Sequence, residues 1–459
     1  MTLLRFCLSH LNISCRKVST IFALSSGSLP SAIAIVRLSG PESFSCLQKL
    51  TRRKSITPRF LFFANLYDRK GALIDRSMSV FLPGPSTFTG EDTVELYVHG
   101  GRAIVDCLCQ TLEEFKDVRA AKAGEFTKRA FYNSKLSLLD VEALSDLLAA
   151  ETQRQRRVAV RQKQLGNLLN EIRNHLVNTM SQVEAGIDFA DEVGFDISTI
   201  LPSVALIIDQ LEKIELNASR GLLIRNGIHV VLIGETNVGK SSLMNRLAER
   251  EIAIVSDIAG TTRDAIETRI ELHSIPIYVT DTAGIRTSDD TLERKGISKT
   301  IEKVSESDIV VVVVDARSNT KDEDVRMLLK NCLVRNDQFI IVVSNKCDLS
   351  DNEMVQLSWP QIMTSCLEGK GIEELIEEIS KAVKNICPDE GNDMVISRQR
   401  HLNLVRQAIC SLKEVNETDD LALIAQHLRN AADAIGEITG AIVNEHILDR
   451  IFSSFCIGK

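Results

Sequence analysis

A run of the form GxxxxGKS, from Gly234 to Ser241, constrains the fold of this chain more than any other feature. It follows the apolar run 228–233 directly, and a helical pattern of apolar residues begins at Leu243. The glycines let the backbone curl so that its N–H groups point at phosphate oxygens, and the helix N-terminus adds a favourable dipole. This is the strand–loop–helix context that a P-loop requires. We expect Lys240 to reach the β- and γ-phosphates of a nucleotide and the Ser241 hydroxyl to bind Mg²⁺.

Two further motifs that handle Mg²⁺ follow at the spacing of small GTPases. Gly260-Thr-Thr262 offers a hydroxyl, from Thr262, that completes the coordination of the metal. Asp281-Thr-Ala-Gly284 follows a short apolar strand at 277–280. Its carboxylate is expected to hold a water bound to Mg²⁺, and its glycine N–H to sense the γ-phosphate.

The last two motifs predict which base is bound. Asn345-Lys-Cys-Asp348 ends in a carboxylate that can accept two hydrogen bonds from guanine, and adenine has no such donor pair. Ser365-Cys-Leu367 would support the base from behind. Together the motifs predict GTP, with contacts from Asn237, Val238, Gly239, Lys240, Ser241, Ser242, Ser256, Asp257, Ile258, Ala259, Gly260, Thr261, Thr262, Asp281, Thr282, Ala283, Gly284, Asn345, Lys346, Asp348, Ser365, Cys366 and Leu367.

The position that orients the attacking water in Ras-type GTPases is not filled by Gln here. The residue after the DTAG motif is Ile285, and an apolar side chain cannot orient water. Another group has to do so. The spacing alone leaves four nearby residues open: Arg286, Asp289, Asp290 and Glu293.

Proline placement and periodicity divide the chain, whose 459 residues suggest roughly three domains. Prolines are absent from 86–201 and from 389 onwards, which permits long helices there. Residues 20–100 have the pattern of strands and turns, with strand candidates at 32–38 and 93–98, and helical periodicity starts at about 136. Residues 226–385 alternate short strands with helices, which predicts a mainly parallel sheet. The expected fold class is α/β plus α, with an N-terminal α+β domain and a P-loop GTPase domain inserted in a long helical domain.

Composition excludes several classes of protein. Hydrophobic residues make up 44% and charged residues 25%, so wholesale disorder is excluded. The longest apolar run, 309–314, is far short of the ~20 residues that a membrane helix needs, and no membrane insertion is expected. Net charge is −8, so any contact with nucleic acid must come from a local patch. The 11 cysteines show no zinc spacing and predict reduced, mostly buried thiols.

The first 30 residues contain Arg5, Arg16 and Lys17 and no acidic residue. Together with frequent Ser, Thr and Leu, this is typical of a mitochondrial transit peptide. The sequence therefore predicts a protein of the mitochondrial matrix. An untargeted N-terminus is the alternative.

The segments around the GTPase motifs indicate a narrower class of protein than the motifs themselves do. The chain ends in Phe452-Ser-Ser-Phe-Cys-Ile-Gly-Lys459, and it contains the segment 81–92 (FLPGPSTFTGED), His99-Gly-Gly101 and the segment 123–131 (AGEFTKRAF). With the order of the domains, these resemble the MnmE/TrmE family of tRNA-modification GTPases, in its mitochondrial branch. The resemblance implies five segments: a transit peptide at 1–19, a folate-binding and dimerisation domain at 20–133, a helical domain at 134–225 and 386–459, and the GTPase domain at 226–385.

The resemblance also implies ligands and site residues. A one-carbon folate, 5-formyl- or methylene-tetrahydrofolate, would bind at Arg37, Glu95, Lys135 and Lys459. A potassium ion would be held by Asn237, Ser256, Ile258 and Thr261 when two GTPase domains pair, and Glu293 would orient the catalytic water. Cys456 would lie near the modification site, with a packed thiol as the alternative. Surface cations and a solvated acid are the alternatives for Arg37, Lys135 and Glu95.

In function, the resemblance implies a homodimeric GTPase that works with an FAD-dependent partner of the MnmG/GidA type. It would install an aminomethyl-type group, carboxymethylaminomethyl or taurinomethyl, at C5 of the wobble uridine of mitochondrial tRNA. The chain contains no GxGxxG of its own, so the flavin is expected on the partner. The alternative is a ribosome-assembly or switch GTPase that makes no covalent change. A basic stripe of Arg154, Arg157 and Arg161 could contact tRNA phosphates, although a solvated helix face fits the same pattern.

Overall fold

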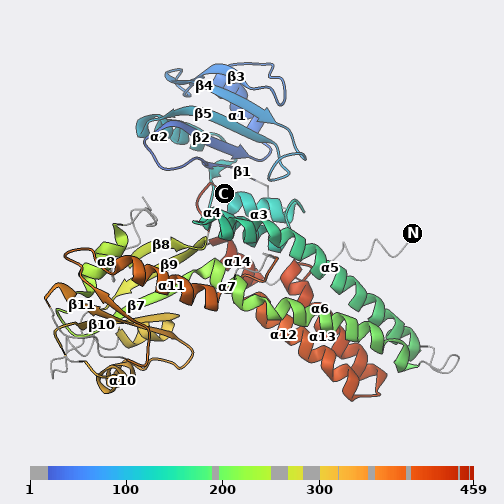
Figure 1. Cartoon of the computed structure of the whole chain (residues 1–459). Coiled ribbons are helices and arrows are strands. Elements are labelled where there is room, and N and C mark those ends of the chain that lie inside the picture. The colour runs from blue at the N-terminus through green and yellow to red at the C-terminus, as the bar shows by residue number, and fades with distance from the viewer. Residues whose placement is uncertain are drawn as a thin grey trace, which may run out of the picture. The chain divides into compact units, whose positions relative to one another are not determined.

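The structure, a computed structural model shown in Figure 1, describes residues 19–188, 196–249, 267–282, 300–318, 320–349, 357–388, 394–442, 445–453 and 455–458. The chain divides into two compact units. One unit comprises residues 1–145 and 439–459, and the other comprises residues 146–438. The sequence placed 439–459 with the helical domain, whereas the structure groups this end with the N-terminal unit. The domain boundaries given above stay predictions.

The N-terminal unit is built on one mixed sheet, with strand order β3-β4-β5-β2-β1-β6. All neighbouring strands are antiparallel except β1 and β6, which are parallel. The strands are β1 (Thr20–Leu24), β2 (Ser31–Ser39), β3 (Phe62–Tyr67), β4 (Leu73–Leu82), β5 (Thr93–Gly100) and β6 (Val118–Ala120). The helices of this unit are α1 (Ser43–Thr51), α2 (Arg102–Glu113), α3 (Glu125–Tyr132), the start of α4 (Leu138–Ala149) and α14 (Glu445–Ser453).

The largest core cluster of this unit packs two helices against alternate residues of the sheet. Alternate residues of β2 and β5, such as Val36 and Leu96, are fully buried and pack with Leu47 of α1 and Leu108 of α2. The predicted strands at 32–38 and 93–98 are confirmed by β2 and β5. The prediction of strands and turns alone over 20–100 is wrong at α1, because a nine-residue helix carries too few turns to show a clear period.

In the second unit, long helices flank an α/β part. The helices are α5 (Gln153–Asp188), α6 (Leu201–Leu216), α7 (Ala218–Asn226), α12 (Gln399–Glu414) and α13 (Leu421–Thr439). Along α5, Leu165, Leu169 and Leu176 are fully buried, which fits the helical periodicity predicted from about 136. By contrast, Leu147 and Leu148 of α4 are 38% and 48% exposed. Among the described helices, none is both long and apolar enough to cross a membrane.

The α/β part holds a six-stranded sheet in the order β12-β11-β10-β7-β9-β8, parallel except for the β8–β9 pair. Its elements are β7 (Ile228–Ile233), α8 (Lys240–Ala248), β8 (Glu267–Leu272), β9 (Ile275–Asp281), β10 (Ile309–Asp315), α10 (Asp322–Asn331), β11 (Phe339–Asn345), β12 (Gln361–Thr364) and α11 (Ile372–Ile386). The predicted strands are confirmed here, and β7 has the predicted bounds.

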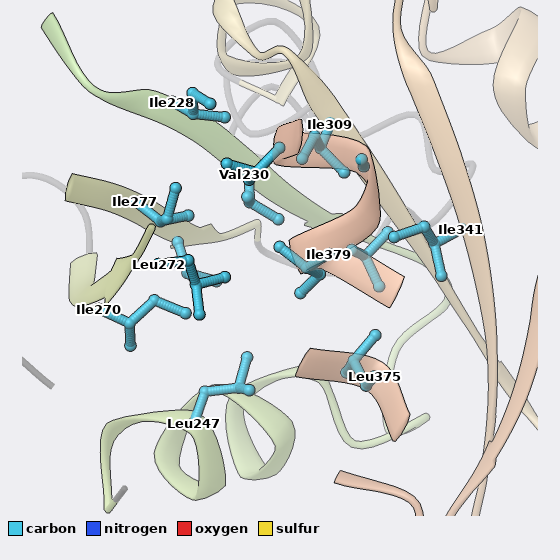
Figure 2. Packing of buried hydrophobic residues seen from close by; sticks show 14 of the residues in the cluster. Ile228, Val230, Leu247, Ile270, Leu272, Ile277, Ile309, Ile341, Leu375 and Ile379 are labelled. Carbon is cyan, nitrogen blue, oxygen red and sulfur yellow. The ribbon is translucent and has the colours of Figure 1, made fainter. Parts of the chain in front are cut away.

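Side chains of this sheet alternate between two buried layers, as the period of a strand requires. Ile228, Val230 and Ile277 point to the side covered by Leu247 of α8 and Ile379 of α11 (Figure 2). The opposite face packs against α10. Both faces are therefore covered by helices, and the predicted α/β plus α fold class is confirmed.

Candidate GTP-binding and folate sites

The loop after β7 can curl as a phosphate-binding loop because two of its residues are glycines. Gly234 has φ +151° and Gly239 has φ +101°, a region that side-chain-bearing residues rarely adopt. A Cβ on Gly239 would lie 2.2 Å from Nδ2 of Asn345. α8 begins directly after Gly239, so its free N–H groups face the loop.

Lys240 lies inside this loop. Its side chain is buried, and its ammonium donates hydrogen bonds to the carbonyls of Gly234 (3.1 Å) and Glu235 (2.8 Å). Burial lowers the pKa of Lys240, and the charge of Asp281 opposes that shift. The loop and its surroundings line a cleft of about 480 Å³, formed by Thr236, Asn237, Gly239, Lys240, Ser241, Ser242, Asp281, Thr282 and Lys346.

Ser241 and Asp281 lie together at the floor of this cleft. The Ser241 hydroxyl donates to Oδ2 of Asp281 at 2.5 Å. Among the described residues, Oδ1 of Asp281 is buried without a hydrogen-bond partner. Mg²⁺ prefers oxygen ligands. The unpartnered carboxylate oxygen and the neighbouring hydroxyl therefore form a pair of oxygen ligands that suits this ion. Thr282 fixes the start of the DTAG motif, since its hydroxyl donates to the Leu232 carbonyl at 2.7 Å.

The base-recognition motif begins at the end of β11. Asn345 is 2% exposed, and its amide donates to the Val238 carbonyl of the P-loop at 2.8 Å. Its oxygen accepts from Thr364 (3.2 Å) and from the backbone of Cys366 (3.4 Å). One side chain thus ties together three loops that the sequence assigned to GTP. Asp348, predicted to bind guanine, lies half-buried in a short 3₁₀ turn just after this strand.

Lys346 is held from two sides. Its ammonium donates to the Asn237 carbonyl (2.7 Å) and pairs with Asp315 at the end of β10 (2.9 Å). Arg317 also binds Asp315, with Nη2 2.7 Å from Oδ2, and these partners lower the pKa of Asp315. Sequence reasoning missed Asp315. One feature of the sequence could have indicated Asp315: it is a carboxylate at the carboxyl end of a predicted parallel strand. Ligand sites of α/β sheets usually lie at those strand ends.

The loop of Cys366 and Leu367 is fixed by Arg246 of α8. Arg246 donates to the carbonyls of Cys366 (2.7 Å) and Leu367 (3.0 Å). Ser365 is fully buried. The structure therefore places the predicted base-supporting loop next to the helix that the P-loop opens.

Other predicted residues lie outside the described part of the chain. They are Ser256, Asp257, Ile258, Ala259, Gly260, Thr261, Thr262, Ala283, Gly284 and Glu293, with Lys459 at the C-terminus.

In the N-terminal unit, two of the predicted folate residues meet. Arg37 on β2 and Glu95 on β5 are register partners, and Nη2 of Arg37 lies 2.9 Å from Oε1 of Glu95. The other carboxylate oxygen accepts from the Tyr97 hydroxyl at 2.6 Å. Burial, followed by the bond to Glu95, raises the pKa of Tyr97 to about 12. Sequence reasoning missed Tyr97, although its place two residues after Glu95 puts it on the same face of the strand.

The C-terminal tail contacts β1 in the same unit. The Ser25 hydroxyl donates to the Gly458 carbonyl at 3.0 Å, and a Cβ on Gly458 would lie 2.1 Å from the Leu24 carbonyl. Cys456 is exposed. Lys135 belongs to the same unit, and its Cε lies beside Gly90.

The basic stripe predicted on α5 is wrong at Arg154. Arg154 is 1% exposed and donates to the Pro388 carbonyl at 3.1 Å, so it can contact neither phosphate nor solvent. The prediction of mostly buried thiols fails too, since only Cys46, Cys332 and Cys387 of the nine described cysteines are buried.

The loop predicted to cradle phosphate is thus bound through Asn345 to the loop predicted to select the base, at the carboxyl ends of parallel strands. That arrangement defines a P-loop GTPase. The comparisons with known proteins are more specific. The family model described as "MnmE helical domain" matches residues 138–456, and "GTP-binding protein TrmE N-terminus" matches 20–135. The chain belongs to the MnmE/TrmE family of tRNA modification GTPases, and it is a GTP hydrolase.

Relatives of full length support this assignment. The chain is 40% identical to the tRNA modification GTPase MnmE of Rhodopseudomonas palustris over 96% of this chain and 99% of that protein. It is 40% identical to the MnmE of Brucella anthropi over 96% and 98%. Among solved structures, the G domain of the T. maritima FeoB iron transporter is 24% identical, with 34% of this chain and 98% of that chain covered and a TM-score of 0.26.

These comparisons contradict one prediction. The relatives found are bacterial proteins from Rhodopseudomonas and Brucella, so the prediction of a mitochondrial matrix protein is wrong. That prediction depended on the composition of about 30 residues, and a short stretch poor in acids arises without any targeting role.

Proposed function

We propose that this GTPase uses a one-carbon folate to modify C5 of the wobble uridine of tRNA, together with an FAD-dependent partner. The observation that carries the proposal is the Arg37–Glu95–Tyr97 cluster, in the same unit as the C-terminal tail. Two partners fix the Glu95 carboxylate on the sheet. A pterin edge carries paired N–H donors, which suit a fixed carboxylate, and the glutamate tail of a folate suits cations such as Lys135 and Lys459.

In this proposal GTP acts as a conformational switch. Lys240 would neutralise the phosphates, and Ser241 and Thr262 would hold Mg²⁺, with Asp281 binding through a water. When bound, the metal supplies charge that stabilises the γ-phosphate during hydrolysis. Potassium would add a second positive charge, held by Asn237, Ser256, Ile258 and Thr261 when two GTPase domains of a homodimer pair.

The roles of Glu293 and Cys456 belong to the same proposal. Glu293 would orient the attacking water, since Ile285 cannot. Cys456 is exposed in the tail, where it would face the modification reaction. The proposed domain boundaries remain 20–133, 134–225, 226–385 and 386–459.

The decisive experiment is nucleoside analysis of tRNA from cells that lack this protein. We expect loss of the C5-modified wobble uridine, with rescue by wild type and no rescue by Glu95→Gln. Glu113→Gln, which changes an exposed acid of the same unit, is the matched control and should rescue. The purified wild type should also retain a reduced folate that Glu95→Gln loses. Unchanged modification in the null cells would reject the proposal and favour a switch GTPase without covalent activity.

A further inference from the structure

An exposed concentration of positive charge outside the GTP site lies in residues 43–67. The chain as a whole has a net charge of −8, yet this stretch contains no Asp or Glu. It holds five cations: Lys49, Arg52, Arg53, Lys54 and Arg59. All five are exposed.

The end of α1 gathers four of these cations, all but Arg59, around one groove. The helix stops at Thr51, and Arg52 takes a left-handed conformation (φ 55°) that turns the chain. The cations therefore cluster at a helix C-terminus, where the dipole favours positive charge. They border a shallow groove of about 310 Å³, which we call the basic groove, lined by Ser45, Gln48, Lys49, Arg52, Arg53 and Lys54.

Aromatic rings support three of these cations. The guanidinium of Arg52 lies 4.2 Å from the Tyr67 ring centroid, and that of Arg53 lies 4.8 Å from Phe62. The ammonium of Lys49 lies 5.4 Å from Phe115. Within the described residues, no acidic side chain forms an ion pair with any of the five cations. Rings hold such cations without cancelling their charge, so the groove keeps its positive potential.

We propose that the basic groove binds the phosphate backbone of the tRNA substrate. This inference rests on the proposed function, which supplies tRNA as substrate. An RNA backbone presents one phosphate per nucleotide, whereas a protein surface mixes charges of both signs. A run of cations without acids therefore fits RNA better than an acidic protein, and the planar guanidinium groups of Arg52 and Arg53 match phosphate oxygens in pairs.

The test uses the full-length protein and an unmodified tRNA transcript with uridine at the wobble position. The variant Lys49→Gln/Arg53→Gln/Lys54→Gln removes three cations of the groove. Lys213→Gln/Lys330→Gln/Lys384→Gln removes three exposed cations elsewhere and changes net charge equally. Binding is measured by fluorescence anisotropy over a series of KCl concentrations. Thermal unfolding checks the fold of both variants. The rate of GTP hydrolysis gives a second check, because none of the six substituted residues belongs to the predicted GTP site.

We expect the groove variant to bind tRNA about 10- to 100-fold more weakly at low salt, with the slope of log K against log salt reduced by about 2 to 3. The control variant should match wild type. Equal tRNA affinity for the groove variant would overturn the inference. So would binding of poly-glutamate as tightly as tRNA, which would indicate a site for acidic protein. If wild type binds no tRNA at all, the proposed function fails instead.

Discussion

The side-chain amide of Asn345 donates a hydrogen bond to the main-chain carbonyl of Val238, across 107 positions of sequence. The same side chain accepts from Thr364 and from the Cys366 backbone. The loop predicted to select the base and the loop predicted to hold phosphate therefore share one buried amide. Nucleotide binding at either loop should stabilise the other.

We predict that Asn345→Ala weakens both the fold and the nucleotide site. The change leaves the Val238 carbonyl and the Thr364 hydroxyl without a partner, which should cost about 1–3 kcal/mol of unfolding free energy. Urea unfolding and titration with GDP measure the two effects. Asn403→Ala, at an exposed helical position, should change neither. Wild-type GDP affinity in Asn345→Ala would contradict the proposed link.

Asp348→Asn should reduce selectivity for guanine. The carboxylate can accept two hydrogen bonds from the base, and the amide can accept only one. We expect GTP affinity to fall by about 1.5–3 kcal/mol, the range for hydrogen bonds to charged groups. Titration calorimetry gives the value, and Asp337→Asn at an exposed site serves as control. Unchanged GTP binding would reject the assignment of Asp348 to the base.

Hydrolysis should depend on potassium. Replacing KCl with NaCl at constant ionic strength should lower the rate of GTP hydrolysis with little change in nucleotide affinity. Sodium is smaller and would not span Asn237 and the ligands predicted between 256 and 261. Phosphate release in each salt measures the effect, and equal rates would show that the potassium site is wrongly assigned.

Glu293→Ala should separate catalysis from binding. If Glu293 orients the water, its loss should lower hydrolysis by a factor of about 10² to 10⁴. GTP affinity should stay as in wild type, because binding does not need that side chain. Single-turnover hydrolysis measures the rate, with Glu302→Ala as an exposed control. A rate within about threefold of wild type would leave Arg286, Asp289 and Asp290 as the residues to test.

Glu125 should make the N-terminal unit sensitive to acid. Burial raises its pKa, but hydrogen bonds from Arg119, the Lys122 backbone and Arg129 outweigh burial and lower the pKa to about 2. A carboxyl group whose pKa is lower in the folded protein than in the unfolded chain stabilises the fold at pH values above the pKa of the unfolded chain. That stabilisation is lost as the pH falls from about 4.5 towards 2.

Glu125→Gln should therefore lower the unfolding free energy at pH 7 by on the order of 1–2 kcal/mol, allowing for solvent screening of the exposed Arg119. The difference from wild type should shrink towards pH 2, where wild-type Glu125 begins to take up its proton. Urea unfolding at pH 7, 4 and 2.5 tests this. A difference that stays constant over this range would show that the carboxylate charge is not the cause.

Local patterns were enough to predict the central strands of the GTPase part. The central strands β7 and β10 are apolar runs that are buried along most of their length, and β7 was predicted at its observed bounds. The P-loop could be predicted because its glycines and Lys240 follow one another in the chain. The helix α1 was missed, since nine residues that pack mainly through Cys46, Leu47 and Leu50 give a weak period.

The sequence by itself determined which short motifs exist and in what order, because each motif is a local run whose backbone conformation its own residues set. Only the tertiary structure decided which distant side chains meet. Arg37 and Glu95 become partners through the register of β2 and β5, and Tyr97 joins them from the same face. Asp315 reaches Lys346 because β10 and β11 lie side by side, and the buried Arg154 meets the Pro388 carbonyl 234 positions along the chain. Such contacts depend on strand register and helix packing, which no local pattern encodes.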